Sequence, residues 1–251
     1  MTQLAGRVVL VTGGNSGIGL GMAEACAAAG ADVAIWGTNA DKNAVAEAAL
    51  KETGRQVVAL QCDVGDEGAV ADAFAETVGR LGKVDACFAN AGVMAMVPFV
   101  DATLEHWRAI TRVNLDGVFL TLREAARHMV ARGEGGALVG ISSVSAIDGA
   151  PANQAYAACK GGVNAMIRGL AVELARHRIR CNSILPGWIE TPMTAPGLSN
   201  EKFVANTTYR TPLRRWGQPS DLGPAAVFLA NPDHLFHTGD CLVVDGGYSI
   251  F

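Results

Sequence analysis

The sequence predicts an α/β fold: a single-domain, Rossmann-like, doubly wound sheet of seven parallel strands flanked by helices. Short apolar runs of strand length alternate with longer helical patterns along the whole chain. Such alternation specifies parallel strands joined by right-handed crossovers. With 50% hydrophobic and 18% charged residues, the 251-residue chain suits a well-buried sheet covered by helices. No repeat or low-complexity linker divides it, so we expect one domain, 1–251.

The elements follow in order from these patterns. Strands are predicted at 8–11, 32–36, 57–61, 86–89, 137–141, 180–185 and 241–244. Helices are predicted between them at 21–29, 41–53, 66–81, 104–132 with a break near Asn114, and 154–176. The segment 190–217, rich in Pro, Thr and Asn, is the least periodic. We expect it to be a mobile lid over the substrate, with an ordinary surface excursion as the alternative.

A glycine-rich loop joins the first strand to the alanine-rich helix that follows. Glycines let the backbone approach a pyrophosphate closely, and a helix N-terminus offers free amides and a partial positive charge. The spacing is Gly-x-x-x-Gly-x-Gly, and the stricter Gly-x-Gly-x-x-Gly fingerprint is absent. Between a strand and a helix, this loop predicts a nucleotide site in preference to a simple turn. Its candidate binding residues are Gly13, Asn15, Ser16, Gly17, Ile18 and Gly19.

Tyr156 and Lys160 lie four residues apart in a predicted helix, so they share one face. A phenol has a pKa of about 10. A nearby ammonium favours the phenolate, so we expect Lys160 to lower the pKa of Tyr156. Such a tyrosine can exchange a proton with an alcohol or ketone oxygen. Taken alone, the pair is also compatible with a half-exposed helix face of no chemical role.

Two serines, Ser142 and Ser143, follow the apolar run 137–141, and Ser143 stands thirteen residues before Tyr156. A buried strand delivers such hydroxyls to its carboxyl end, where open α/β sheets bind their ligands. Ser143 is therefore a candidate to contact the reacting oxygen. Satisfying backbone groups in a turn is the alternative, and it is the preferred interpretation for Ser142. No Gly-x-Ser-x-Gly surrounds either serine, so neither forms a nucleophile elbow.

Together these residues resemble the short-chain dehydrogenase/reductase family, and the resemblance spans essentially the whole chain. The family's Thr-Gly-x-x-x-Gly-x-Gly loop matches 12–19. Its Asn-Ala-Gly motif, the Asp-Val pair that caps the adenine, and the Pro-Gly turn after the sixth strand also match. The matching residues are Asn90-Ala91-Gly92, Asp63-Val64, and Pro186-Gly187 followed by Thr191. The family's four catalytic residues match Asn114, Ser143, Tyr156 and Lys160.

The resemblance implies an NAD(P)-dependent oxidoreductase that transfers hydride between the nicotinamide and a ketone or secondary alcohol. Tyr156 is then the general acid and base, Ser143 holds the same oxygen, and Lys160 also holds the nicotinamide ribose. Asn114 organises a water relay to Lys160; its alternative is a helix-interrupting asparagine bonded to backbone. Two other functions stay open: a 3-oxoacyl thioester reductase acting on an acyl carrier protein, and a non-catalytic dinucleotide-binding sensor or scaffold.

Further contacts are implied in the same way. Beyond the glycine loop, the cofactor is expected against Gly37, Thr38, Asn39, Asp63, Val64, Asn90, Ala91, Gly92, Tyr156, Lys160, Pro186, Gly187, Ile189 and Thr191. Five residues fall near motifs that border the family's substrate pocket: Met94, Ser145, Trp188, Met193 and Phe203. Apolar residues of this kind suit a hydrophobic ketone or secondary alcohol, and core packing is their alternative role.

The choice between NADP and NAD depends on the end of the second strand. An acidic residue there bonds the adenosine ribose 2′-hydroxyl in NAD-binding folds, and this chain has none at 36–39. We expect Gly37 to leave room for a 2′-phosphate with Thr38, Asn39 and Lys42 as donors, which favours NADP, with NAD also used. Gly37→Asp should then move preference toward NAD. Alternatively, Thr38 and Asn39 begin the next turn and cap its helix.

Charge and composition bound the partners. The net charge of −4 gives no reason to expect nucleic acid or an acidic membrane. No uncharged apolar run reaches the roughly 18 residues of a membrane helix. The chain leads straight into its first strand, so we expect no signal peptide. Six cysteines without a paired framework are typical of reduced thiols in the cytoplasm. His234 and His237 lack further ligands, so no metal site is expected.

The C-terminal tail predicts assembly. After Asp245 it carries no charged side chain and ends in Tyr248, Ile250 and Phe251. Terminal residues are normally polar and frayed unless something holds them. Relatives in the family commonly form tetramers, so we expect a homotetramer with the tail in a subunit contact. The alternative is that Ile250 and Phe251 fold back on their own subunit.

Overall fold

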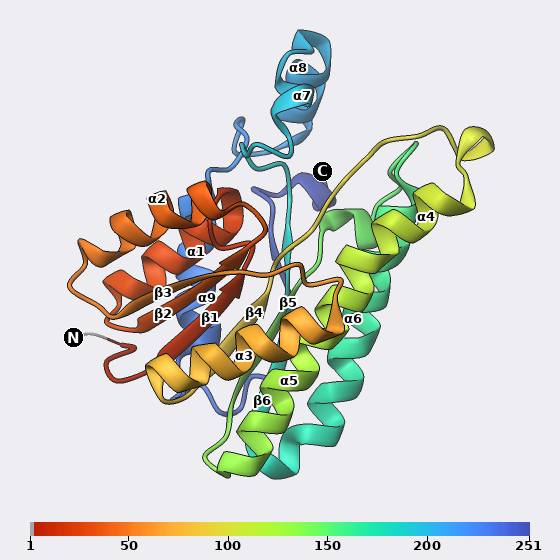
Figure 1. Ribbon diagram of the computed structural model, residues 1–251. Coiled ribbons are helices and arrows are strands. Elements are labelled where there is room, and N and C mark those ends of the chain that lie inside the picture. Colours follow the sequence, from red (N-terminus) through yellow and green to blue (C-terminus); the bar gives the residue numbers. More distant parts are fainter. Residues whose placement is uncertain (1–2) are drawn as a thin grey trace.

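The computed structural model describes residues 3–251 and contains one sheet of seven strands, all parallel (Figure 1). The strand order is β3-β2-β1-β4-β5-β6-β7, so the chain reverses direction across the sheet between β1 and β4. The predicted fold class is confirmed. The strands are β1 Val8–Thr12, β2 Asp32–Gly37, β3 Val57–Gln61, β4 Ala86–Ala89, β5 Gly136–Ile141, β6 Ile179–Pro186 and β7 Cys241–Val244.

Helices cover both faces of this sheet, and each layer seals its own core. On one face, α3, α5 and α6 pack over a cluster that includes Leu10, Phe74 and Leu138. On the other, α1, α2 and α9 cover a second cluster around Val9 and Phe88. The helices are α1 Gly17–Ala28, α2 Ala40–Lys51, α3 Glu67–Leu81, α4 Leu104–Thr111, α5 Gly117–Arg132, α6 Gln154–Leu174, α7 Ala195–Leu198, α8 Glu201–Arg210 and α9 Gly223–Ala230.

The strands are apolar on both faces because both faces are covered. Every residue of β1 and of β6 is buried. This is why these strands appear in the sequence as continuous apolar runs and not as alternating patterns. A polar contact links the layers, since the indole of buried Trp36 on β2 donates to Thr77 Oγ1 on α3 at 3.0 Å. The sheet is therefore a rigid platform for the groups at its strand ends.

Some elements differ from the sequence prediction. Helix α1 begins at Gly17, four residues earlier than expected. Helices α7, α8 and α9 were not predicted; α9 is apolar all round, so it carries no helical period. The expected break near Asn114 is a single π-helical turn, Arg112–Asp116, through which α4 continues into α5. Within residues 3–251, none of the helices combines the length and apolar character needed to cross a membrane.

The segment 190–217 leaves the body of the protein beyond the carboxyl ends of the strands (Figure 1). It carries α7 and α8, and its two ends are tied together. Glu190 N donates to Gly217 O at 2.9 Å, and Gly217 N donates to Trp188 O at 2.8 Å. The segment is thus an excursion with a closed neck.

Candidate active site

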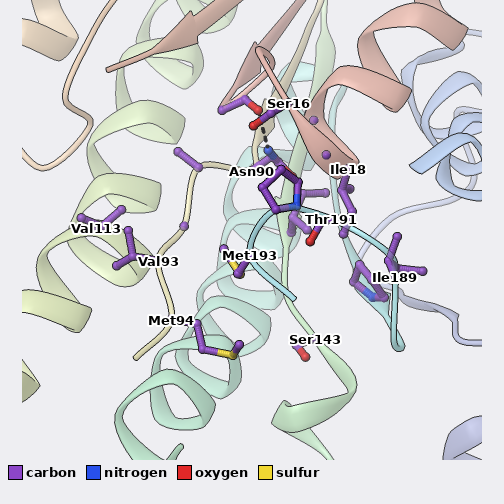
Figure 2. Close-up of a pocket in the computed structure, with 18 of the residues that line it drawn as sticks. Ser16, Ile18, Asn90, Val93, Met94, Val113, Ser143, Ile189, Thr191 and Met193 are labelled. Carbon is purple, nitrogen blue, oxygen red and sulfur yellow. Dashed lines mark hydrogen bonds between the residues drawn. The ribbon is translucent and has the colours of Figure 1, made fainter. Parts of the chain in front are cut away.

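A cleft of about 470 Å³ opens at the carboxyl ends of the strands, next to the point where the strand order reverses. Open α/β sheets bind their ligands at this position. Figure 2 shows side chains from the glycine loop, from the segments after β4 and β5 and from the segment after β6 around one space. All the predicted site residues line it except Asn114 and Phe203. Those that do are Gly13, Asn15, Ser16, Gly17, Ile18, Gly19, Gly37, Thr38, Asn39, Asp63, Val64, Asn90, Ala91, Gly92, Met94, Ser143, Ser145, Tyr156, Lys160, Pro186, Gly187, Trp188, Ile189, Thr191 and Met193.

At Gly19 the loop has no room for a side chain. A Cβ at Gly19 would lie 2.2 Å from Gly13 O. Asn90 fixes the loop from β4, because its Nδ2 donates to Thr12 O at 2.8 Å. Thr12 Oγ1 in return accepts from the Asn90 and Ala91 amides, at 3.0 Å each. The Asn-Ala-Gly motif therefore holds the loop against the end of β1.

The start of α1 fits the pyrophosphate of a dinucleotide. Its N-cap, Ser16, makes no side-chain capping bond. The first amides of a helix have no partner within the helix, so those of Gly17, Ile18 and Gly19 can meet an anion. Because the glycines leave the backbone bare at this point, the residues present fit the phosphates of a nicotinamide dinucleotide.

The Cβ side of Gly37 is occupied by two asparagine side chains. A Cβ at Gly37 would lie 2.2 Å from Asn15 Nδ2 and 2.6 Å from Asn43 Oδ1, because the Asn15 amide already occupies that space. Gly37→Asp would first have to displace the Asn15 amide, and its effect on cofactor preference stays a prediction. Asn39 caps α2, as its alternative interpretation held: its Oδ1 accepts from Lys42 N at 2.9 Å.

Asp63 borders the cleft in an ion pair that the sequence patterns did not indicate. Arg112, on the π turn, donates to its Oδ2 at 3.0 Å, and Gly65 N donates to Oδ1 at 2.9 Å. Burial raises the pKa of the Asp63 carboxyl, but the bonds from Arg112 and Gly65 outweigh it and hold the pKa below its usual range. Asp63 is therefore a fixed anion at this rim.

Tyr156 and Lys160 enter the cleft from one face of α6. The Lys160 side chain is buried, its Nζ donates to Ile141 O at 2.8 Å, and Nζ lies 5.3 Å from the Tyr156 ring centroid. Burial lowers the pKa of Lys160 to about 8. Burial also raises the pKa of Tyr156 to about 12, against the hydrogen bond with Ser143, which lowers it. The expected lowering of the Tyr156 pKa by Lys160 is thus wrong for this structure, because desolvation disfavours both charged forms.

The two serines after β5 have different surroundings. Ser142 Oγ donates to Lys160 O at 2.9 Å, which ties β5 to α6 and matches its backbone-satisfying interpretation. Ser143 lines the cleft, and its Oγ accepts from Ser145 N at 3.1 Å while its hydroxyl interacts with Tyr156. Only Ser143 is therefore placed to share an oxygen atom with Tyr156.

Asn114 lies behind the cleft and is fully buried. Its Nδ2 donates to Val93 O and Ile110 O at 2.9 Å each, and its Oδ1 accepts from Val93 N at 3.2 Å. The backbone-bonded interpretation thus describes its contacts. A Cβ at Gly92 would lie 2.8 Å from Asn114 Oδ1 and 3.7 Å from Lys160 Nζ. Both side chains therefore lie close to the Cβ position of Gly92.

The remaining wall is largely apolar, and Figure 2 shows Met94 and Met193 on it with Val93 and Val113. Phe203 does not line the cleft: it packs edge-on against Trp188 and Trp216, with ring centroids 5.0 and 6.1 Å away. The lining residues that sequence patterns missed include Val93, Arg112, Val113 and Thr194. Val93 and Thr194 lie in irregular segments, which have no period that shows which way a residue faces. Arg112 and Val113 lie on the π turn, which interrupts the helical period.

Comparison with known proteins agrees with this geometry. Residues 13–249 match the family model described as "Enoyl-(Acyl carrier protein) reductase". The L-rhamnose 1-dehydrogenase (NAD(P)(+)) of Sphingomonas sp. (strain SKA58) is 38% identical over 98% of both chains. The gluconate 5-dehydrogenase of Gluconobacter oxydans is 35% identical over 99% of this chain and 96% of that one.

Solved structures agree as well. A gluconate 5-dehydrogenase from Burkholderia cenocepacia, in complex with NADP and tartrate, has a TM-score of 0.94 at 36% identity, covering 99% of this chain and 97% of that one. A short-chain type dehydrogenase/reductase from Mycobacterium marinum has a TM-score of 0.95 at 33% identity, covering 100% and 98%. With the family model, the relatives and the cleft in agreement, the chain belongs to the short-chain dehydrogenase/reductase family.

Proposed function

We propose that this protein interconverts a ketone and a secondary alcohol with NAD(P), using Tyr156 as general acid and base. The observation that carries this function is the convergence of Tyr156, Ser143 and Lys160 on the cleft that the glycine loop lines. The activity class is that of the relatives, NAD(P)-dependent dehydrogenases and reductases that include enzymes of rhamnose and gluconate. The complete set of four residues argues against a sensor that has kept only the fold.

The chain's own residues handle the proton. When bound, the nicotinamide ring supplies or accepts the hydride. Tyr156 gives its proton to the carbonyl oxygen in reduction and takes it from the hydroxyl in oxidation. Ser143 holds the same oxygen in place. The raised pKa of Tyr156 keeps its hydroxyl protonated at neutral pH, which is the form that reduction needs. Lys160, with a pKa of about 8, can exchange protons near neutral pH, and Asn114 beside it would organise the water relay.

The cofactor would lie along the cleft. The amides at the start of α1 would bind the pyrophosphate, and Asp63 and Val64 would border the adenine. Pro186, Gly187, Ile189 and Thr191 would border the nicotinamide. A Cβ at Gly17 would lie 3.3 Å from the Thr191 side chain, so this segment packs directly on the glycine loop.

The segment 190–217 would act as the substrate lid, and Met94, Ser145, Trp188 and Met193 would form the substrate pocket. Two features of the 190–217 segment support this role: its ends are bonded together, and its first residues line the cleft. A lid of this kind excludes water and admits the substrate when it opens. The substrate would be a small carbonyl or alcohol molecule.

We further propose a cytoplasmic homotetramer. Ile250 is 88% exposed and Phe236 is fully exposed, which is unusual for large apolar side chains on a lone subunit. Phe251 packs partly on its own Tyr209, with ring centroids 6.3 Å apart. Light scattering coupled to size exclusion should give a tetrameric mass at micromolar concentration. A monomeric mass would contradict the assembly, and a tetramer unaffected by deletion of 249–251 would contradict the role of the tail.

The function is tested by a panel of ketones and alcohols, with nicotinamide absorbance as the readout and both cofactors supplied. The panel includes sugars, sugar acids, hydrophobic ketones and a 3-oxoacyl thioester, since one relative is a 3-oxoacyl-[acyl-carrier-protein] reductase of Chlamydia pneumoniae. We expect turnover of ketones and secondary alcohols. Tight cofactor binding without turnover of any panel member would favour the sensor.

A further inference from the structure

A buried asparagine outside the family's motifs, Asn43, stands behind the adenosine end of the cleft. It is 4% exposed, and its Nδ2 donates to Gly37 O and to Leu60 O at 3.0 Å each. Carbonyl oxygens only accept hydrogen bonds, so two of them on one side of the amide determine where its nitrogen lies. The Asn43 side chain therefore has one orientation.

The orientation of Asn43 determines the orientation of the Asn15 amide. With its nitrogen used, Asn43 presents Oδ1, which accepts from Asn15 Nδ2 at 2.7 Å. Asn15 must therefore turn its own oxygen away from Asn43. The only polar partner of that oxygen among the described residues is Ser16 Oγ, at 3.5 Å. Asn15 lines the cleft beside Gly37, so the chain presents a neutral acceptor with spare capacity at that wall.

The Asn15 oxygen lies near the end of β2. The end of β2 is where NAD-binding folds place a carboxylate that accepts from the adenosine ribose 2′-hydroxyl. Here β2 ends at Gly37, and a Cβ on Gly37 would lie 2.2 Å from Asn15 Nδ2. The Asn15 amide thus fills the volume in which a side chain of residue 37 would begin.

We propose that Asn43 is a positioning residue for cofactor choice: it turns the Asn15 amide oxygen outward to accept from the adenosine ribose 2′-hydroxyl in place of the missing carboxylate. The acceptor is neutral, so it favours NAD without the repulsion of a 2′-phosphate that a carboxylate would exert. Lys42, also in the cleft wall, is available to such a phosphate. The inference deepens the proposed function and rests on its placement of the cofactor.

The test measures binding directly. Calorimetry gives the dissociation constants of NAD⁺, NADP⁺ and the 2′-deoxyadenosine analogue of NAD⁺ for wild type, Asn43→Leu, Asn15→Ala and the double variant. We expect each single variant to weaken NAD⁺ about fivefold, the effect of one neutral hydrogen bond. Binding of NADP⁺ and of the deoxy analogue should change less than about twofold. In the Asn15→Ala background, Asn43→Leu should leave the ratio of NAD⁺ to NADP⁺ affinity unchanged.

Asn182→Leu is the matched control. Asn182 is a buried asparagine that also bonds backbone groups, His237 O and Asp240 N, but lies outside the cleft. It should lower stability without moving the affinity ratio. Equal weakening of all three ligands by Asn43→Leu, or a ratio shift that persists without Asn15, would overturn the inference. If Asn43→Leu does not fold, Asn15→Ala decides alone: it must remove the difference between NAD⁺ and its deoxy analogue. Failure of wild type to bind either cofactor would instead defeat the proposed function.

Discussion

In the floor of the cleft, Lys160 and Asn90 are fixed by buried bonds to strand ends, whereas the 190–217 segment is held at its neck and through contacts at its surface. Lys160 on α6 bonds the end of β5, and Asn90 after β4 bonds the end of β1. Beyond its neck, the 190–217 segment contacts the body through two ion pairs, Arg210 to Asp148 at 2.9 Å and Arg215 to Asp221 at 2.6 Å. Leu213 N also donates to Gly246 O at 3.3 Å, and aromatic rings pack around Trp188.

The difference separates chemistry from substrate choice. Proton transfer needs atoms held within fractions of an ångström, and buried bonds to strand ends supply that precision. A segment tied at its neck can change its contacts without disturbing the strand ends, so it can adapt to different substrates. Changes to the floor should therefore lower turnover, and changes to the lid should alter apparent substrate affinity.

Removal of the Tyr156 hydroxyl should have the largest effect. Tyr156→Phe loses the proton donor, and general acid catalysis contributes about 10²- to 10⁴-fold. We expect kcat to fall by that factor while the cofactor dissociation constant changes less than about twofold. The measurements are steady-state kinetics and calorimetry on the same preparation. Turnover within about threefold of wild type in the folded variant would remove Tyr156 from its role.

Gly92→Ala should test whether the placement of Asn114 and Lys160 around Gly92 matters for turnover. The new Cβ would lie 2.8 Å from Asn114 Oδ1, and three hydrogen bonds hold that side chain in place. Displacing the pair should lower kcat about tenfold or more, since small misplacements in a catalytic array are costly. Gly79→Ala is the control, because a Cβ there meets nothing within 4 Å. Equal rates for the two variants would show that Asn114 and Lys160 need no fixed spacing.

Burial of Lys160 should appear in the pH dependence of stability. Its folded pKa of about 8 lies below the ordinary lysine pKa of 10.5, so between these values the unfolded chain binds more protons. Stability should therefore rise with pH from about 8. Above about 10.5, the cost of burying a charged Lys160 should be gone. From pH 8 to 9 the wild type should gain about 1 kcal/mol relative to Lys160→Met, measured by denaturant unfolding. Parallel curves for both proteins would mean that Lys160 stays charged in the folded state.

The sequence predicts features that depend on neighbouring residues better than contacts between distant ones. Strands, glycine loop and catalytic spacing follow from local pattern, because buried strands and motifs leave marks in consecutive residues. Arg112 and Asn43 act through partners far along the chain, such as Asp63 and Asn15, and no periodicity reveals those pairings. The pKa directions of Tyr156 and Lys160 also escaped prediction, since the helix spacing gives their proximity but not the depth at which they lie.

The smallest predicted effect concerns the lid. Asp148→Asn removes the charge partner of Arg210, and both side chains are partly exposed, at 25% and 41%. Such pairs contribute at most about 1 kcal/mol, so KM should rise about two- to threefold with kcat preserved. Raising the ionic strength should bring the wild-type KM toward that of the variant, because salt screens the pair. Glu76→Gln, which breaks the surface pair with Arg80 on α3, is the control and should leave KM unchanged. A fall in kcat without a change in KM would instead make Asp148 part of the floor, since it follows β5 by only a few residues.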